Sequence, residues 1–174
     1  HGLTLDFSKS GGPHSGNLNA PEAVVRAAVL YALRVLADQD IPLNEGALRH
    51  VQIVLSRPSI LSPPPTCAVA GGNVETSMRI VDLVLRAAGR MASSCGSMSN
   101  LTLGGPGWTL YETIGGGQGA SRHGHGANGR QVHMTNTRAT DPEVLETRLP
   151  VRLHTMAYRP QSGGLGRHVG GNGL

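Results

Sequence analysis

The sequence is poor in aromatic residues, which make up only 3% of its 174 residues. A buried core must therefore be built from aliphatic side chains, and an apolar fraction of 39% is high enough for a folded domain. A chain of this length can bury a core of its own. We expect a single domain over residues 1–174.

Lysine is almost missing, because Lys9 is the only one among fifteen basic residues. The other basic residues are arginines scattered along the chain, and they give a formal net charge of +4. Nucleic-acid-binding proteins gather basic residues into a patch or place aromatic side chains beside them for stacking. This chain does neither, so the sequence predicts no nucleic-acid partner.

Cysteine is also scarce, and Cys67 and Cys95 lack the spacing of a metal site. Their separation leaves a disulfide open, but we expect two free thiols in a reducing cytoplasm. No apolar run approaches the ~20 residues of a membrane-spanning helix, and no secretory signal is recognised. The sequence therefore predicts a cytoplasmic location and no membrane partner.

The apolar pattern predicts an α+β fold with a mixed or antiparallel sheet, two main amphipathic helices and Gly-rich loops. The first helix should begin after Asn19 or Ala20 as its cap and end near Asp38. The second helix covers residues 78–88, and a third, short helix follows Asp141 as its cap. Strand-like patterns occupy residues 3–8, 51–55, 101–103, 108–114, 132–138 and 151–159. No βαβ rhythm and no internal repeat accompanies them.

A glycine turn at residues 71–77 leads into the second helix. Free N–H groups at a helix start can bind an anion, but neither a phosphate-loop lysine nor a dinucleotide-binding fingerprint is present. The favoured interpretation is a tight turn with Asn73, Thr76 or Ser77 capping the helix. A substrate carboxylate or carbonyl bound at this helix start is the alternative.

The chain is organised around the Gly-rich stretch between Glu112 and Arg138. Glycine permits close backbone approach, and the flanking polar side chains supply donors, acceptors and a base. The stretch therefore predicts the substrate-side wall of an active site, with a Gly-rich hairpin of satisfied polar groups as the alternative. If the two flanking runs pair, Glu112 and His133 should face a cleft shared with Asn73. Glu112 should also lie on the face of Leu110 and Ile114.

Six blocks of the sequence resemble the hydantoinase B/5-oxoprolinase family, in the family's own order. They are Asn-Leu-Asn-Ala-Pro at 17–21, Gly-Gly-Asn-Val-Glu-Thr-Ser at 71–77, Tyr-Glu-Thr-Ile-Gly-Gly-Gly at 111–117, His-Met-Thr-Asn-Thr at 133–137, Asp-Pro-Glu-Val-Leu-Glu at 141–146, and Ser-Gly-Gly-Leu-Gly-Arg with a later Gly-Gly over 162–171. The chain departs from the family's pattern at Met78, Cys95, Gln131 and Asn172.

The resemblance implies a fragment: the C-terminal portion of a much longer protein. The start at His1 within a strand-like pattern and the open Gly-rich end at Leu174 agree with that expectation. The family opens cyclic amides such as hydantoins or 5-oxoproline together with an ATP-binding hydantoinase A-type subunit or domain. Its relatives carboxylate acetone or acetophenone. The resemblance also implies a divalent metal in the earlier half of the protein, so we expect no metal or other cofactor on this chain, and a homo- or hetero-oligomer.

Under this resemblance, Glu112 and His133 are the predicted catalytic bases. The predicted substrate-binding residues are Asn73, Thr76, Ser77, Gly116, Gly117, Thr135 and Asn136, the later ones as donors to developing oxyanions. The alternative for Glu112 and His133 is structural pairing with Arg138 or with backbone groups. The chain would then be a non-catalytic scaffold for the hydantoinase A-type subunit, or part of a carboxylase-like enzyme.

Overall fold

The computed structural model describes residues 2–174, so His1 and its place in the first strand-like pattern lie outside the described residues. The backbone contacts divide the chain into an N-terminal unit, His1–Ala87, and a C-terminal unit, Ala88–Leu174. Three α-helices and two small sheets confirm the predicted α+β class. No helix within residues 2–174 is long and apolar enough to cross a membrane.

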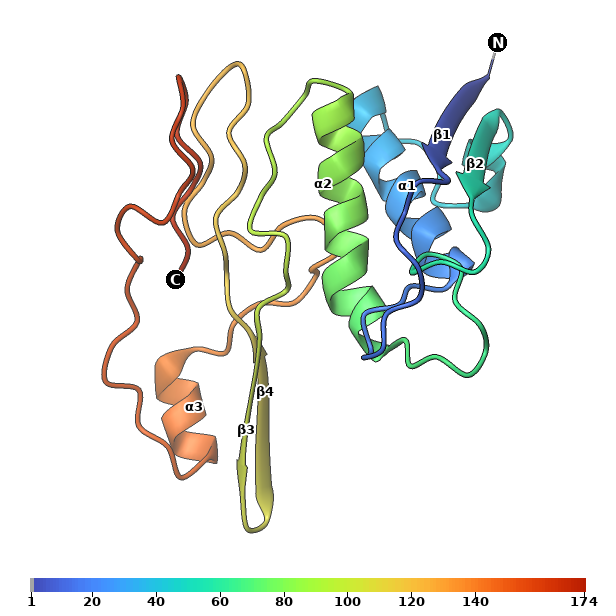
Figure 1. Cartoon of the computed structure of the whole chain (residues 1–174). Coiled ribbons are helices and arrows are strands. Elements are labelled where there is room, and N and C mark those ends of the chain that lie inside the picture. The colour runs from blue at the N-terminus through green and yellow to red at the C-terminus, as the bar shows by residue number, and fades with distance from the viewer. Residues whose placement is uncertain (1) are drawn as a thin grey trace. The chain divides into compact units, whose positions relative to one another are not determined.

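The N-terminal unit combines a small sheet with a helix pair (Figure 1). Strands β1 (Leu3–Phe7) and β2 (Val51–Leu55) pair in parallel. Helices α1 (Glu22–Ala37) and α2 (Ser77–Ala87) pack against each other. A 3-10 turn, η1 (Glu45–Leu48), precedes β2. These strands and helices confirm the corresponding sequence predictions.

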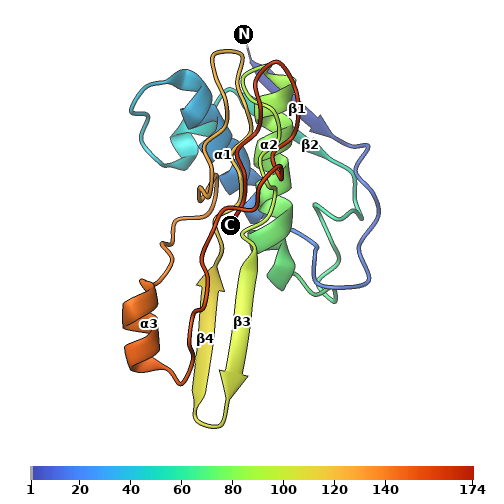
Figure 2. The same cartoon turned by 90° about the vertical axis from the view of Figure 1, so that its left-hand side faces the viewer.

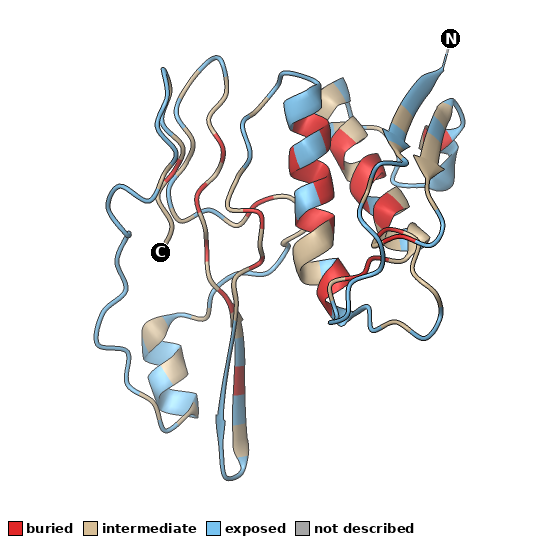
Figure 3. Ribbon diagram, in the orientation of Figure 1, coloured by how far each residue is buried: buried red, intermediate tan, exposed pale blue. Residues whose placement is uncertain are grey.

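The core of this unit lies between α1 and α2 and is aliphatic, as the shortage of aromatics predicts. Val25 and Val29 of α1 and Met78, Val81 and Leu85 of α2 are buried. Figure 3 shows the buried residues of both helices along the line where they meet. Each large apolar side chain that is removed from water contributes roughly 1.5–3 kcal/mol. The spacing of apolar residues along the sequence therefore indicates both helices and also the faces through which they pack together.

Asn19 does not cap α1, because Pro21 occupies that position. The Asn19 side chain is fully buried and cross-links the preceding loop instead. Its Oδ1 accepts from the His14 N–H at 2.7 Å, and its Nδ2 donates to three carbonyls, those of His14, Gly16 and Ala68, at 2.9–3.1 Å. This polar anchor satisfies backbone groups that have no place in a helix or sheet.

The C-terminal unit contains a long antiparallel hairpin, clearly visible in Figure 2. Its strands are β3 (Asn100–Gly105) and β4 (Trp108–Thr113), and Pro106 and Gly107 form the turn between them. Gly107 has a φ of 79°, a conformation that glycine adopts without steric cost. Proline followed by glycine at positive φ is the sequence signature of a type II turn.

Helix α3 (Pro142–Arg148) follows as predicted, with Asp141 as its cap. Oδ1 of Asp141 accepts from the N–H of Glu143 at 2.9 Å and from that of Val144 at 3.4 Å. The cap satisfies two of the N–H groups that a helix start leaves without a partner.

Two predicted strands are wrong, those at 132–138 and 151–159, neither of which forms a strand. The first contains a turn at His133, whose φ of 52° interrupts an extended conformation. The condition that the Glu112 run pairs with the His133 run is therefore not met. β4 pairs with β3 because a two-residue turn connects those strands directly.

Four extended segments of the C-terminal unit lie side by side and form what we call the glycine layer: residues 92–95, 115–120, 126–130 and 169–174 (Figures 1 and 2). The N–H groups of Ala92 and Cys95 donate to the carbonyls of Ala120 and Gly117. The same spacing of three residues recurs between other neighbours in the layer. The N–H groups of residues 171 and 174 donate to the carbonyls of 118 and 115, and those of 126 and 129 donate to the carbonyls of 169 and 172. Three residues per turn is the repeat of the polyproline II conformation.

Glycine is required in this layer because neighbouring backbones occupy the space of a side chain. A Cβ atom on Gly117 would overlap the carbonyl of Gly171, and one on Gly119 would overlap that of Ala92. The glycine run that sequence analysis singled out is thus packed backbone against backbone.

Candidate functional site

The glycine layer borders a cavity of about 290 Å³ in the C-terminal unit, which we call the glycine cavity. Gly115–Gly117 continue directly from β4 and form part of its wall. The Ser-rich turn at 93–99, residues 162–164 and the chain end from 170 onward contribute further lining. Arg159 is the only charged side chain of the wall. Backbone groups and hydroxyls thus provide most of its polar surface.

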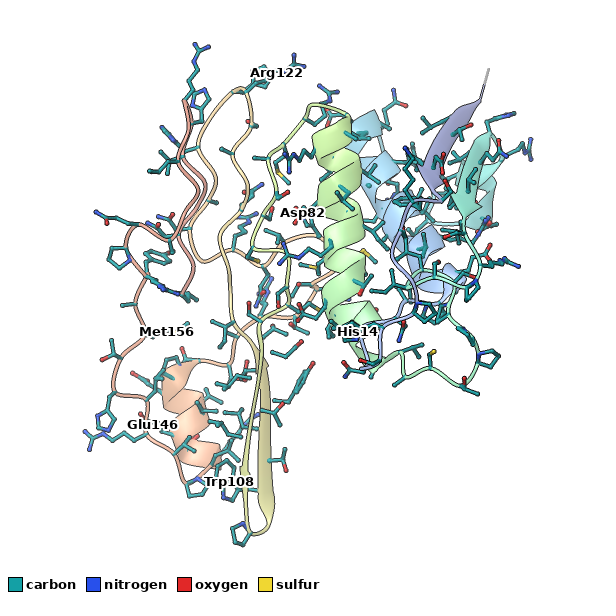
Figure 4. All side chains as sticks on the ribbon, in the orientation of Figure 1. His14, Asp82, Trp108, Arg122, Glu146 and Met156 are labelled. Atoms are coloured by element: carbon teal, nitrogen blue, oxygen red, sulfur yellow. The ribbon has the colours of Figure 1, made fainter. Side chains whose placement is uncertain are left out.

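A second cavity of about 230 Å³ lies between the β3–β4 hairpin, α3 and residues 153–157, and we call it the apolar cavity. Met156, labelled in Figure 4, comes from the extended segment after α3. The apolar lining is Leu101, Leu110, Ile114, Ala139, Leu145, Leu153, Met156, Ala157 and Leu174. Glu112 is the one acidic group among the lining residues, beside the hydroxyls of Thr140 and Thr155.

The two cavities adjoin where β4 ends. Ile114 and Leu174 line both of them. The strand therefore carries Glu112 into the apolar cavity and, within a few residues, Gly115–Gly117 into the glycine cavity. Glu112 therefore lines one cavity of the C-terminal unit, and the Gly115–Gly117 backbone and Arg159 line the cavity next to it.

The Glu112 carboxylate is bound to Thr140, the residue that precedes the α3 cap. It accepts from the Thr140 hydroxyl and, at 3.2 Å, from the Thr140 N–H. Leu110, Glu112 and Ile114 line the same cavity, which confirms the predicted alternation along this strand. Thr140 thus fixes the orientation of the carboxylate at the cavity wall, a contact with no signal in the sequence.

His133 lies half-buried in its turn and lines neither of the two cavities. The turn is attached to the end of β4 through Thr113, whose hydroxyl is 2.6 Å from that of Thr137. Nε2 of Gln131 donates to the carbonyl and hydroxyl oxygens of Thr113 at 2.8 and 2.9 Å. Gln131, one of the departures from the family pattern, therefore holds the turn that carries His133.

The two other predicted residues of this turn differ in their surroundings. The N–H of Thr135 donates to the carbonyl of Val132 at 3.1 Å and closes the turn. Asn136 is exposed. The structure thus brings His133, Thr135 and Asn136 together on one turn, next to the end of the strand that carries Glu112.

Asn73, Thr76 and Ser77 belong to the N-terminal unit, and the predicted side-chain cap of α2 is wrong. The backbone is already helical from Gly72, as a π-helical turn, η2 (Gly72–Thr76), so these residues lie inside the helical segment. The Ser77 hydroxyl donates to the carbonyl of Asn73, and the Thr76 hydroxyl to that of Leu18. Both hydroxyls therefore have structural partners.

The tight turn predicted at residues 71–77 is likewise wrong, because these residues belong to the helical segment, and close backbone contacts explain their two glycines. A Cβ atom on Gly72 would overlap the carbonyl of Asn19, and one on Gly71 would lie 2.9 Å from that of Asn17. The two glycines allow α2 to begin against the 17–20 loop. Asn73 itself is exposed, and its convergence with Glu112 and His133 remains a prediction.

No sequence pattern predicted Arg159 at the cavity or the role of Asn172. Oδ1 of Asn172 accepts from the N–H groups of Ser162 and Gly163, both at 3.1 Å. The side chain at this departure from the family pattern therefore shapes the 162–163 turn beside the glycine cavity. Only the position of Arg159 just before the 162–167 block gave any signal in the sequence.

Cys67 and Cys95 are both free thiols. The Cys95 sulfur packs against Gly116 and donates to the carbonyl of Ser97 at 3.3 Å. Within residues 2–174, no three His, Cys, Asp or Glu side chains gather as a metal site requires.

Comparison with known proteins agrees with the family blocks found in the sequence. The family model described as hydantoinase B/oxoprolinase matches residues 1–174. The chain is 52% identical to 5-oxoprolinase 1 of Arabidopsis thaliana over 171 residues, 98% of this chain and 14% of that protein. It is 45% identical to the 5-oxoprolinase of Dictyostelium discoideum, over 98% of this chain and 13% of that protein.

A third similar protein comes from an archaeon. An uncharacterized protein of Methanocaldococcus jannaschii is 38% identical to this chain, over 99% of the chain and 32% of its own length. The chain thus spans a small share of the curated relatives that it matches. The match over every described element identifies this chain as a member of the hydantoinase B/oxoprolinase family.

Proposed function

We propose that this chain forms the substrate-side wall of the active site in a cytoplasmic, ATP-dependent cyclic-amide hydrolase. The observation that carries the proposal is the junction of the two cavities at the end of β4, with Glu112 on one side and Gly115–Gly117 on the other. Membership of a family with 5-oxoprolinases supports the reaction class. The likeness covers only part of those enzymes, so the activity is that of the whole protein.

The chemistry divides naturally between this chain and an ATP-binding partner. An amide resists hydrolysis because of its resonance, and phosphorylation of its oxygen makes the ring carbon electrophilic. We assign the ATP step to a hydantoinase A-type subunit or domain, an assignment that agrees with the lack of a phosphate loop in this sequence. The present chain holds the ring, orients the attacking water and stabilises the developing negative charge.

Specific residues take these roles. Glu112, whose carboxylate Thr140 orients, and His133 act as bases toward water. The backbone N–H groups of Gly116 and Gly117, with Thr135 and Asn136, donate to oxygens that become negative. Because the glycine layer fixes this backbone, little reorganisation accompanies the reaction. Asn73, Thr76 and Ser77 complete the substrate wall in this proposal.

Turnover of variants of the whole protein, with its ATP-binding partner, ATP and 5-oxoproline, tests the proposal. Glu112→Gln and His133→Ala should each lower turnover at least ~100-fold, the scale of a lost general base. The exposed residues Glu143 and His154 provide the matched controls Glu143→Gln and His154→Ala, which should retain turnover. Thermal unfolding of all four variants should change little. Near-normal turnover together with a stability loss of ~2 kcal/mol or more would show structural roles instead.

A scaffold without catalytic groups is the second candidate, and specific contacts favour it. Glu112, Thr76 and Ser77 all have hydrogen-bond partners within the chain, and His133 lines neither cavity. A scaffold predicts that the Glu112 and His133 variants change the association with the ATP-binding subunit, measured by sedimentation, without changing the turnover of assembled complexes.

A further inference from the structure

Arg159, an exposed residue, is the one lining residue of the glycine cavity whose side chain carries a formal charge. The other lining side chains carry no formal charge, so no Asp or Glu opposes it there. The ion pairs found within residues 2–174 use Arg26, Arg34 and Arg57, and none uses Arg159. Glycine and serine backbones form most of the remaining wall. The cavity is therefore electrostatically suited to an anionic group.

The backbone of Arg159 is fixed at this wall. Its N–H donates to the carbonyl of Gly173 at 2.8 Å, and its own carbonyl accepts from the Ser162 hydroxyl at 2.8 Å. The Ser162 oxygen in turn accepts from the N–H of Gly173 at 3.0 Å. This closed set of hydrogen bonds holds the base of the side chain while leaving the guanidinium without a carboxylate partner.

A guanidinium in such a position recognises a carboxylate. Its planar group can donate two parallel hydrogen bonds to the two carboxylate oxygens, which an ammonium group does less well. At about 290 Å³ the cavity lies at the lower end of the roughly 300–1,000 Å³ typical of small-molecule pockets, a size that suits a small ring. Glu112 lines the adjoining apolar cavity, and Ile114 and Leu174 line both cavities.

We propose that Arg159 binds a carboxylate carried by the substrate ring and thereby selects carboxylated cyclic amides over neutral ones. This inference rests on the proposed function, because it assigns a substrate class to the same site. 5-Oxoproline carries such a carboxylate, whereas 2-pyrrolidone has the same lactam ring without it. Arg159 is thus a specificity-determining residue, not a residue that acts on the amide bond.

Steady-state kinetics on the whole protein, with its ATP-binding partner, tests this role against both rings. A hydrogen bond to a charged group is worth about 1.5–3 kcal/mol, so Arg159→Gln should lower kcat/KM for 5-oxoproline about 10- to 100-fold. The loss should appear in KM, and kcat/KM for 2-pyrrolidone should stay unchanged. Arg159→Lys should restore part of the preference because it keeps the charge without the planar fork.

The matched control is Arg122→Gln, which removes an arginine at a loop tip of the same unit, outside the cavity wall (Figure 4). This variant should keep the wild-type preference. An equal loss for both rings in Arg159→Gln overturns the inference, because it indicates a general structural role. An unchanged preference for 5-oxoproline overturns it as well.

Equilibrium binding separates this inference from the proposed function. If the wild-type protein turns over neither ring, the hydrolase proposal fails, and calorimetric titration with 5-oxoproline and 2-pyrrolidone still decides the role of Arg159. Tighter binding of 5-oxoproline that Arg159→Gln abolishes supports a carboxylate site. Equal binding of both compounds, or binding of neither, overturns it.

Discussion

In the N-terminal unit, aliphatic side chains of α1 and α2 fill the space between two helices, whereas in the C-terminal unit backbone segments touch directly. Only Met98, Leu110 and Val132 of the buried hydrophobic residues belong to the C-terminal unit. That unit instead relies on hydrogen bonds among the extended segments of the glycine layer. One chain thus uses two different means of holding its backbone in place.

This difference indicates which amino-acid substitutions each unit tolerates. A side-chain core accepts many apolar replacements of similar volume. The glycine layer accepts almost none, because the position of a Cβ atom is already filled by a neighbouring carbonyl, as at Gly117 and Gly171. The same close packing brings backbone groups to the wall of the glycine cavity, so structural and functional demands coincide there.

The strongest test of the comparison is Gly117→Ala. The added methyl group would overlap the Gly171 carbonyl, so the layer must open. Overpacking costs typically 1–3 kcal/mol and sometimes more, and we expect about 3 kcal/mol or more here because a backbone, not a side chain, must move. Hydrogen exchange of peptides covering 115–120 and 169–174 in the whole protein should show the loss of protection.

Gly124→Ala is the matched control, since nothing lies within 4 Å of its added methyl group. We expect unchanged or slightly increased stability, because alanine restricts the unfolded chain. Equal protection from hydrogen exchange in Gly117→Ala and Gly124→Ala would mean that the glycine layer does not depend on close contact between its backbone segments.

The next largest effect should come from the side-chain core. Leu85→Ala on α2 removes a side chain that is 2% exposed, and it should cost about 3 kcal/mol through lost burial and a residual cavity. Leu83→Ala on the same helix removes one that is 56% exposed and should change stability by less than about 0.5 kcal/mol. Chemical unfolding followed by exchange of the α2 peptide measures both. Similar losses at the two positions would contradict the observed orientation of α2.

Asn19→Ala should give a smaller loss and sharpens the comparison, because it tests a polar anchor within the apolar unit. The change leaves three carbonyls and one N–H without their partner. Unsatisfied buried groups cost about 1–3 kcal/mol, and water reaching the loop should keep the loss near 2 kcal/mol. Exchange of residues 14–19 should rise most. A uniform rise across α1 and α2 would instead indicate that Asn19 supports the helix pair.

Sequence patterns predicted the elements of the N-terminal unit better than those of the C-terminal unit. Apolar spacing located α1 and α2, and alternation located β1 and β2, because these patterns follow from which faces are buried. The pairing of β4 was missed although Pro106 and Gly107 marked the turn, since a polar-rich run at 132–138 resembled a second strand. His133 interrupts this run with a positive φ, and the turn around it is attached to Thr113, a residue distant in sequence, through Gln131 and Thr137.

For the candidate site, the sequence pointed to Glu112 and the glycine run but missed Thr140 and Arg159. Motifs reveal residues that are close together in the sequence. Thr140 reaches Glu112 across 28 positions, and Arg159 joins Gly115–Gly117 only because the chain end folds back into the glycine layer. Such contacts leave no local pattern.

The sequence by itself determined the family, the aliphatic core, the two main helices and the need for glycine between Glu112 and Arg138. These features depend on local spacing, composition and short motifs. Tertiary structure alone decided which strand pairs with β4, which backbone fills the space beside Gly117, and that Arg159 borders the same cavity as Gly115–Gly117. The physical reason is that hydrogen bonds and close contacts between segments far apart in sequence form only when the folded chain places them side by side.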